Sequence, residues 1–196
     1  MPVWMWFFAA ALVLIVVTGL LVVVLGGRRR RTSRLQKQFG PEYDRAVAET
    51  GEQRAAEKEL VARTRKRDKL DIRPLTRDAL DAYSRRWRHV QSAFVDSPSD
   101  ALDDVEGLLT AVMRERGYPV DDFDQRAADI SVDHPAVVQN YRSAHAIHLA
   151  EKDGNASTED QRQAFVHYRA LFAELLEHDQ TDDRRQPHNP TQEASA

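Results

Sequence analysis

Four histidines are the side chains whose type and spacing best match metal chemistry. His145 and His148 lie three residues apart, which places both on one face of a helix. His134 and His167 can approach this pair if the helices that carry them pack antiparallel. Neutral imidazoles gathered in this way bind zinc and similar ions. The sequence has no HExxH or paired Glu-x-x-His motif, so the alternative is that these histidines pack beside the apolar faces of their helices.

Acidic residues form two short runs that would suit calcium only with further ligands. The runs are Asp103, Asp104 and Glu106, and Asp121, Asp122 and Asp124. Neither run has the glycine and the distal glutamate of an EF-hand loop. Carboxylates at the start of a helix oppose the positive end of its dipole, and we expect that solvated, structural role for both runs.

Motifs for other chemistry are missing from the sequence. It has no glycine-rich phosphate loop, no GxSxG nucleophile motif and no kinase or nucleotide fingerprint. Because there is no cysteine, disulfides, thiolate metal sites and thiol nucleophiles are excluded. We therefore predict no catalytic residue and no cofactor, and we rank an enzyme below a non-enzymatic protein.

Charge divides the 196 residues into parts of different character. Residues 1–27 carry no charged side chain, residues 28–73 carry 15 Lys or Arg against 8 Asp or Glu, and residues 74–196 carry 13 against 23. Such asymmetry indicates that the basic part meets an anionic surface while the acidic part stays in water. Nucleic acid is a disfavoured partner, because the aromatic platforms and the basic fold of nucleic-acid-binding modules are missing.

The apolar N-terminal segment is long enough to cross a membrane. Residues 3–25 form an uninterrupted run in which only Thr18 and Gly19 are not hydrophobic. As a helix, these 23 residues extend about 34 Å, which exceeds the roughly 30 Å hydrocarbon core of a bilayer. A cleaved signal peptide would have a positive start, a shorter apolar stretch and a small-x-small cleavage site. We therefore predict a single transmembrane anchor at residues 1–27.

Basic residues lie on only one side of the predicted anchor. They are Arg28, Arg29, Arg30, Arg31, Arg34 and Lys37. The positive-inside rule places this side in the cytoplasm and the N-terminus outside the plasma membrane. Each arginine beside lipid headgroups contributes about 1 kcal/mol, so we predict that these side chains contact anionic lipid at the membrane surface.

Residues 28–73 are predicted to be a basic, helical juxtamembrane linker. A narrow apolar stripe recurs every four residues, at Leu35, Phe39, Tyr43 and Val47. We expect breaks at Gly40, which precedes Pro41, and at Gly51, with a further helix at 52–70. A second basic cluster at 63–69 reaches lipid only if the chain folds back at Gly40. Otherwise the segment is a solvated spacer.

Residues 74–178 are predicted to be an acidic, all-α domain, a bundle of four to five helices. Apolar residues at alternating spacings of three and four predict helices at 76–95, 98–117, 121–130, 133–154 and 157–178. Capping residues support the last two starts, Asp133 for one and a capping box from Ser157 to Asp160 for the other. Residues 179–196 have no large apolar side chain and are predicted to be a disordered tail.

The apolar positions of these helices form the predicted core. They are Leu80, Tyr83, Trp87, Val90 and Phe94; Leu102, Val105, Leu109 and Val112; Phe123, Ala127 and Ile130; Val138, Tyr141, Ala144, Ile147 and Leu149; and Phe165, Tyr168, Phe172 and Leu175. A domain of just over 100 residues is large enough to bury a core of its own.

Several stretches resemble a group of small actinobacterial single-pass membrane proteins. They are Arg34-Leu-Gln-Lys-Gln-Phe-Gly-Pro-Glu-Tyr-Asp-Arg45, Asp71-Ile-Arg-Pro-Leu75, Arg116-Gly-Tyr-Pro-Val120, Asp133-His-Pro135 and Gln163-Ala-Phe-Val-His-Tyr-Arg169. The resemblance covers most of residues 34–176. It implies the layout of an anchor followed by a helical domain, and it implies no catalytic residue.

The leading hypothesis is a membrane-tethered, non-enzymatic interaction or scaffold module whose helices bind a protein partner of unknown identity. A rival hypothesis is a membrane-bound metal-binding enzyme or sensor that uses the histidines. A third makes the basic segment the functional part, recruiting anionic lipid of the bilayer. Helical patterning without a polar constellation in the sequence favours the first.

Overall fold

A computed structural model describes Thr18 and residues 29–185, with side chains described as far as Leu176. These residues are helical or lie in turns and loops, and no strand is found among them, which confirms the predicted all-α class. The predicted anchor lies outside the described residues apart from Thr18, which is helical. In the described part of the chain, no helix combines the length and the hydrophobicity needed to cross a membrane.

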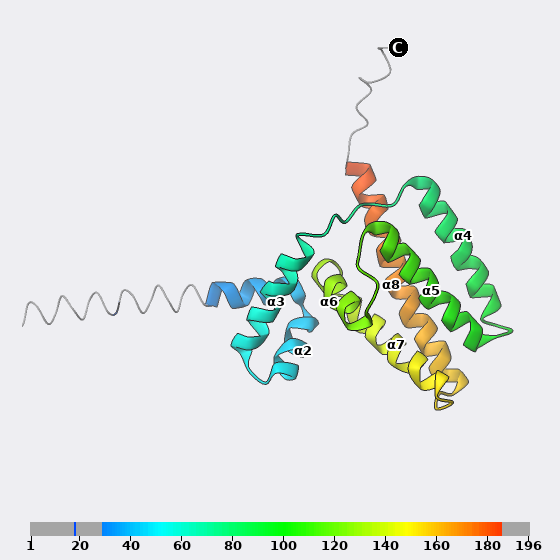
Figure 1. The fold of residues 1–196 in the computed structure, drawn as a ribbon, viewed down its shortest axis with the longest axis horizontal. Helices are drawn as coiled ribbons and strands as arrows, with labels where there is room; N and C mark the ends of the chain where they lie inside the picture. Colours follow the sequence, from blue (N-terminus) through cyan, green and yellow to red (C-terminus); the bar gives the residue numbers. More distant parts are fainter. Residues whose placement is uncertain (1–17, 19–28, 186–196) are drawn as a thin grey trace, which may run out of the picture. The chain divides into compact units, whose positions relative to one another are not determined.

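Two compact units divide the chain, Met1–Leu60 and Val61–Ala196. The helix α3, Gln53–Arg67, runs across the division. Apart from α3, no helix of the described residues is shared between the two units. In Figure 1 the helices of the first unit are coloured blue to cyan and those of the second from cyan to red. The finer division that the sequence predicts, at residues 27, 73 and 178, stays a prediction.

The first unit contains a helix at 29–39, α2 at Pro41–Thr50 and the start of α3. The predicted breaks are confirmed: Gly40 has a φ of 49° before Pro41, and Gly51 caps α2 with a φ of 67°. The predicted stripe residues Leu35, Phe39 and Tyr43 are buried. Val47 is only half-buried and Ala46 takes the buried position, because a helix repeats every 3.6 residues rather than every four.

A single carboxylate ties the helices of the first unit together. Glu57 Oε1 accepts hydrogen bonds from Thr32 Oγ1 at 2.6 Å, from Tyr43 Oη at 3.2 Å and from Gln53 Nε2 at 3.1 Å. In one straight helix Thr32 and Glu57 would lie about 37 Å apart. The chain therefore folds back between Thr32 and Glu57, which is one of the alternatives that the sequence leaves open.

The second unit is built from the helices α4 to α8. Their bounds are α4 Arg77–Ala93, α5 Pro98–Arg116, α6 Phe123–Asp133, α7 Val138–Lys152 and α8 Thr158–Arg185. Figure 1 shows α8 lying against both α5 and α7, with α4 on α5 and α6 on α7. Almost all the predicted core residues are buried or partly buried in one cluster. Trp87 of α4 stacks on Phe172 and Phe165 of α8, with ring centroids 4.6 Å and 5.3 Å apart.

Side-chain caps fix the starts of α4 and α8 where the sequence predicts these helices to begin. Thr76 caps α4 by accepting from the amide of Ala79. Ser157 and Asp160 bond reciprocally, which is the predicted capping box of α8.

Three local predictions are wrong. The helix predicted from Asp133 starts instead at Val138, because the Asp133 carboxylate accepts hydrogen bonds from Tyr118 Oη at 2.6 Å and Arg67 Nε at 2.7 Å. Leu149 is 50% exposed, because it lies two residues after Ile147 and so turns away from the buried face. The last helix continues past His178 to Arg185, since neither proline nor glycine occurs between them; residues 186–196 of the predicted tail lie outside the described residues.

A close approach of the backbone fixes the C-terminal end of α5. Gly117 has a φ of 96°, and a Cβ atom added there would collide with the carbonyl oxygen of Asp71. Beside it, the amide of Arg73 donates to the carbonyl of Arg116 at 2.9 Å. Residues 71–73 therefore lie directly against the end of α5, and only glycine fits at that point.

We expect Gly117→Ala to lower the free energy of unfolding by about 3 kcal/mol, because it adds a backbone collision to an unfavourable positive φ. Gly154→Ala is the matched control: its φ is 72°, but its Cβ would meet nothing within 4 Å. Gly154→Ala should lower the free energy of unfolding by only about 1 kcal/mol. Urea unfolding of the full-length chain in neutral detergent, followed by circular dichroism, measures both, and equal losses would contradict the close approach.

Candidate functional site

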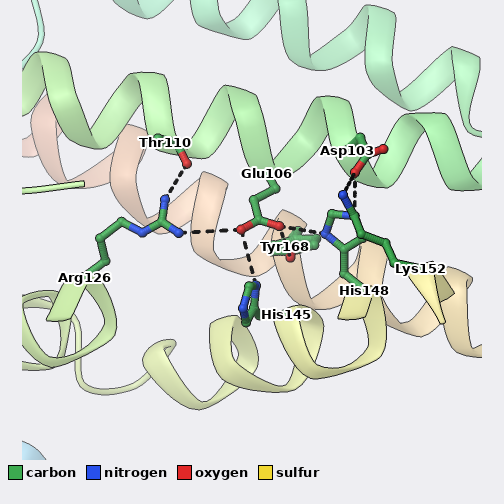
Figure 2. A network of polar contacts seen from close by, with 8 residues as sticks. All are labelled: Asp103, Glu106, Thr110, Arg126, His145, His148, Lys152 and Tyr168. Atoms are coloured by element: carbon green, nitrogen blue, oxygen red, sulfur yellow. Dashed lines mark hydrogen bonds and ion pairs between the residues drawn. The ribbon is translucent and has the colours of Figure 1, made fainter. Parts of the chain in front are cut away.

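The most connected polar site in the described residues centres on Glu106 of α5. Its Oε2 lies 2.7 Å from His148 Nδ1, and its Oε1 lies 3.3 Å from His145 Nδ1. The first contact is a hydrogen bond, whereas the second is an electrostatic contact without hydrogen-bond geometry. The predicted shared face of His145 and His148 on α7 is therefore real, and it faces a carboxylate (Figure 2).

His148 is held between two carboxylates. Its Nε2 lies 2.8 Å from Asp103 Oδ1, while its Nδ1 contacts Glu106. A neutral imidazole has one N–H and donates to one acceptor, whereas the imidazolium donates to both. The His148 side chain is only 3% exposed, so this double contact is a buried link between α5 and α7.

Cations and hydroxyls from four further positions complete the site. Arg126 of α6 places Nη2 3.6 Å from Glu106 Oε1 and donates from Nη1 to Thr110 Oγ1 at 2.7 Å. Tyr168 of α8 donates to Glu106 Oε2 at 3.5 Å. At the exposed end, Lys152 Nζ lies 2.8 Å from Asp103 Oδ1. The network thus joins α5, α6, α7 and α8 around one carboxylate (Figure 2).

The surroundings shift the pKa values of the two central groups in opposite directions. Burial raises the pKa of Glu106, but the contacts with His145 and His148 outweigh it and hold this pKa well below its ordinary value. Hydrogen bonding to Glu106 raises the pKa of His148, against the opposing effect of burial and with the help of Asp103. The two groups therefore form an ion pair at mildly acidic pH, below the ordinary histidine pKa of 6.5.

The other two candidate histidines lie elsewhere. His134 Nδ1 contacts Glu174 Oε1 at 3.2 Å, and His167 Nε2 contacts the Gln163 side chain at 3.1 Å. Among the described residues, no group of three or more histidine, aspartate or glutamate side chains has the arrangement to hold a metal ion. The four-histidine cluster of the metal hypothesis is therefore not assembled.

Sequence reasoning missed the role of Glu106. The prediction that its acidic run is a solvated helix start is wrong for Glu106, which lies in the middle of α5 with a side chain 20% exposed. A signal was present: Asp103 and Glu106 are three residues apart, as are His145 and His148. When two helices pack together, an acidic pair with this spacing on one can bond to a histidine pair with the same spacing on the other. Only the tertiary structure shows that α5 and α7 are the helices that pack in this way.

Comparisons with known families, curated proteins and solved structures find no match.

A second polar feature is a basic recess on the helix at 29–39. Its lining residues are Arg29, Arg30, Ser33, Arg34 and Lys37. These include four of the cations predicted to contact the membrane; Arg28 lies outside the described residues. Arg31 differs from them because its charge acts on Glu57. Burial raises the pKa of Glu57, but its hydrogen bonds and the Arg31 charge lower it below the ordinary value.

The second predicted basic cluster is not uniformly available for lipid. Arg67 donates to Asp133 at 2.7 Å. Burial lowers the pKa of Arg67, but the bond to Asp133 raises it above the ordinary value. This cation of the 63–69 cluster is therefore used to fix the start of the second unit.

Asp129 of α6 is a buried carboxylate with no hydrogen-bond partner on either oxygen. The residue is 1% exposed. Burying a polar group without a hydrogen-bond partner costs about 1–3 kcal/mol, so this side chain opposes folding.

Stability should change with pH through the Glu106–His148 pair. The contribution of His148 is fully present below its ordinary pKa of 6.5 and is lost as pH rises through its raised pKa. The contribution of Glu106 is present above 4.5 and is lost as pH falls through its lowered pKa. We expect His148→Gln to lower the free energy of unfolding by about 2 kcal/mol at pH 6 and by clearly less at pH 9.

Unfolding midpoints measured between pH 5 and pH 9 test this expectation. His89→Gln is the control, since His89 is exposed on α4. A cost of His148→Gln that does not vary with pH would contradict the imidazolium link.

Removing the Asp129 carboxylate should stabilise the protein. We expect Asp129→Ala to raise the free energy of unfolding by about 1–2 kcal/mol, because it removes a buried carboxyl group without a hydrogen-bond partner and improves helix propensity. Asp124→Ala, at an exposed first-turn position of the same helix, should instead cost a few tenths of a kcal/mol. Denaturant unfolding compares the two, and a destabilised Asp129→Ala variant would show that a partner satisfies the carboxylate in solution.

Proposed function

We propose that this protein is a membrane-tethered helical module that binds a protein partner and catalyses no reaction. In this proposal residues 1–27 form the single transmembrane anchor in the plasma membrane, with the N-terminus outside. Residues 28–73 link the anchor to a cytoplasmic bundle at residues 74–178. The length of the apolar run and the arginines that follow it support this arrangement.

The observation that carries the proposal is a pair of exposed apolar side chains at one end of the second unit. Val95 is 81% exposed and Leu149 is 50% exposed, and they are the large apolar side chains most open to water in the described residues. A shallow pocket lies beside Leu149, at the turn between α7 and α8. It is lined by Ala146, Ile147, Ala150, Asn155, Ala156 and Asp160.

The two exposed side chains belong to the same end of the unit. Gln161 at the start of α8 donates to Ser99 at the start of α5, at 3.0 Å. The α4–α5 turn with Val95 and the α7–α8 turn therefore lie at the same end, as Figure 1 shows. Apolar surface rimmed by polar residues is typical of sites that bind protein partners.

The Glu106 site supports a structural rather than a catalytic use of the histidines. Both ring nitrogens of His148 face carboxylates, and the Glu106 oxygens contact three other helices. Groups engaged in this way hold helices together, and a general acid or base instead needs access to a substrate proton.

Topology is the first test of the proposal. The chain has no cysteine, so Val95→Cys introduces a unique and exposed thiol in the bundle. We expect a membrane-impermeant maleimide to label it in permeabilised cells only, because the bundle lies in the cytoplasm. Pro2→Cys, on the other side of the anchor, should be labelled in intact cells. Labelling of Val95→Cys in intact cells would place the domain outside and overturn the proposal.

Partner binding is the second test. A photo-reactive amino acid at Leu149 should form one discrete adduct in living cells, because this position faces the partner. The adduct should disappear when Ala150→Glu puts a charge into the adjoining pocket. Arg85, an exposed position on α4, is the control site and should give no such adduct. The same adducts from Leu149 and Arg85 would count against a specific surface.

The basic recess favours a second function, the recruitment of anionic lipid next to the anchor. Exposed cations within a Debye length of headgroups, about 8 Å, attract acidic phospholipids. This function and partner binding are compatible, since they use different units of the chain.

A further inference from the structure

The basic recess has a defined shape. Its residues 29, 30, 33, 34 and 37 follow the spacing of neighbouring side chains on one face of a helix. From the first to the last of them the helix rises about 12 Å. Four cations and the hydroxyl of Ser33 therefore line one narrow strip, with Ser33 in its middle.

The orientation of this strip is fixed by the opposite face of the same helix. Leu35 is 5% exposed and Phe39 is fully buried. Thr32 is bonded to Glu57 at 2.6 Å, and the Arg31 charge acts on the same carboxylate. The fold therefore separates Arg31, which is close to an anion, from the cations of the recess. Arg29, Arg30, Arg34 and Lys37 are exposed, and none of them forms an ion pair with a carboxylate of the described residues, so their charge faces outward.

We propose that the recess is a binding site for a phospholipid headgroup that carries two phosphate groups, as in diphosphatidylglycerol. The proposal rests on the proposed recruitment of anionic lipid and adds a preferred headgroup to it. Guanidinium groups bind phosphate oxygens through two parallel hydrogen bonds, Lys37 supplies a point charge, and the Ser33 hydroxyl donates between them.

Charge favours this ligand over a single phosphodiester, and position places Arg29 at the depth of lipid headgroups. Four cations on one face exceed the single charge of phosphatidylglycerol, whereas two phosphates can each meet a pair of cations. If residues 3–25 cross the membrane, Arg29 follows the hydrocarbon boundary by four residues, or about 6 Å. That distance corresponds to the headgroup layer, about 5–8 Å thick on each side of the hydrocarbon core.

Native mass spectrometry of the full-length protein in neutral detergent tests the proposal. Diphosphatidylglycerol and phosphatidylglycerol are titrated separately at the same ionic strength, and the dissociation constant of the first bound lipid is measured. We expect the two-phosphate lipid to bind about tenfold more tightly. Millimolar inorganic pyrophosphate should not displace it; displacement would overturn the assignment to lipid and favour a soluble phosphate ligand.

Charge-preserving variants separate a site from diffuse attraction. The double variant Arg30→Lys/Arg34→Lys keeps every charge but loses bidentate contacts, so the tenfold preference should vanish. Arg31→Lys is the matched control, because Arg31 lies outside the recess, and this variant should keep the tenfold preference for diphosphatidylglycerol. Ser33→Ala should weaken diphosphatidylglycerol binding several-fold and leave phosphatidylglycerol unchanged.

Failure of the inference and failure of lipid recruitment give different results. If both lipids bind equally and both lysine variants behave like the wild type, the recess attracts anionic lipid without a specific site, and the inference falls alone. If neither lipid binds more tightly than neutral phosphatidylcholine, lipid recruitment itself is wrong.

Discussion

The second unit depends on the carboxylate of Glu106, which is contacted by side chains from three other helices. Arg126 reaches it from α6, His145 and His148 from α7, and Tyr168 from α8. Such a partly buried charge is costly unless it is paired, and removing one partner leaves the others unsatisfied. The network therefore links α5 to α6, α7 and α8 at one point, while the apolar core around it selects the neighbouring helices and supplies most of the driving force for folding.

In the first unit, too, one carboxylate joins several helical segments. Glu57 accepts from Thr32, Tyr43 and Gln53, one from each helical segment of that unit. A segment with few apolar residues cannot hold a turn through hydrophobic burial alone. A shared acceptor lets it fold back, and this fold-back gives the basic helix one buried face and one exposed, cationic face.

The proposed functions follow from the side chains that the Glu106 and Glu57 networks leave exposed at the surface. In the second unit, polar groups with catalytic potential are paired inside, while Val95, Leu149 and the pocket at the α7–α8 turn stay open to water. In the first unit, the recess keeps four cations and a hydroxyl on one strip, next to the apolar run in the sequence. The proposed lipid site therefore lies in the first unit and the proposed partner surface in the second.

The sequence by itself determined the helices. Periodic apolar residues, the cap at Thr76, the glycine at 117 and the capping box at Ser157 are local signals, and local hydrogen bonds and side-chain spacing decide helix bounds. The exposed position of Leu149 was also within reach of this reasoning, because its spacing from Ile147 does not fit one helical face.

Only the tertiary structure decided which polar groups meet. His148 and Glu106 are 42 residues apart in the chain, and Asp133 and Arg67 are 66 apart. Asp133 could cap a helix or accept from Tyr118 and Arg67, and its local sequence does not distinguish these outcomes. The choice is made by packing, since the apolar faces of the helices fix their neighbours and thereby bring particular side chains within hydrogen-bonding distance.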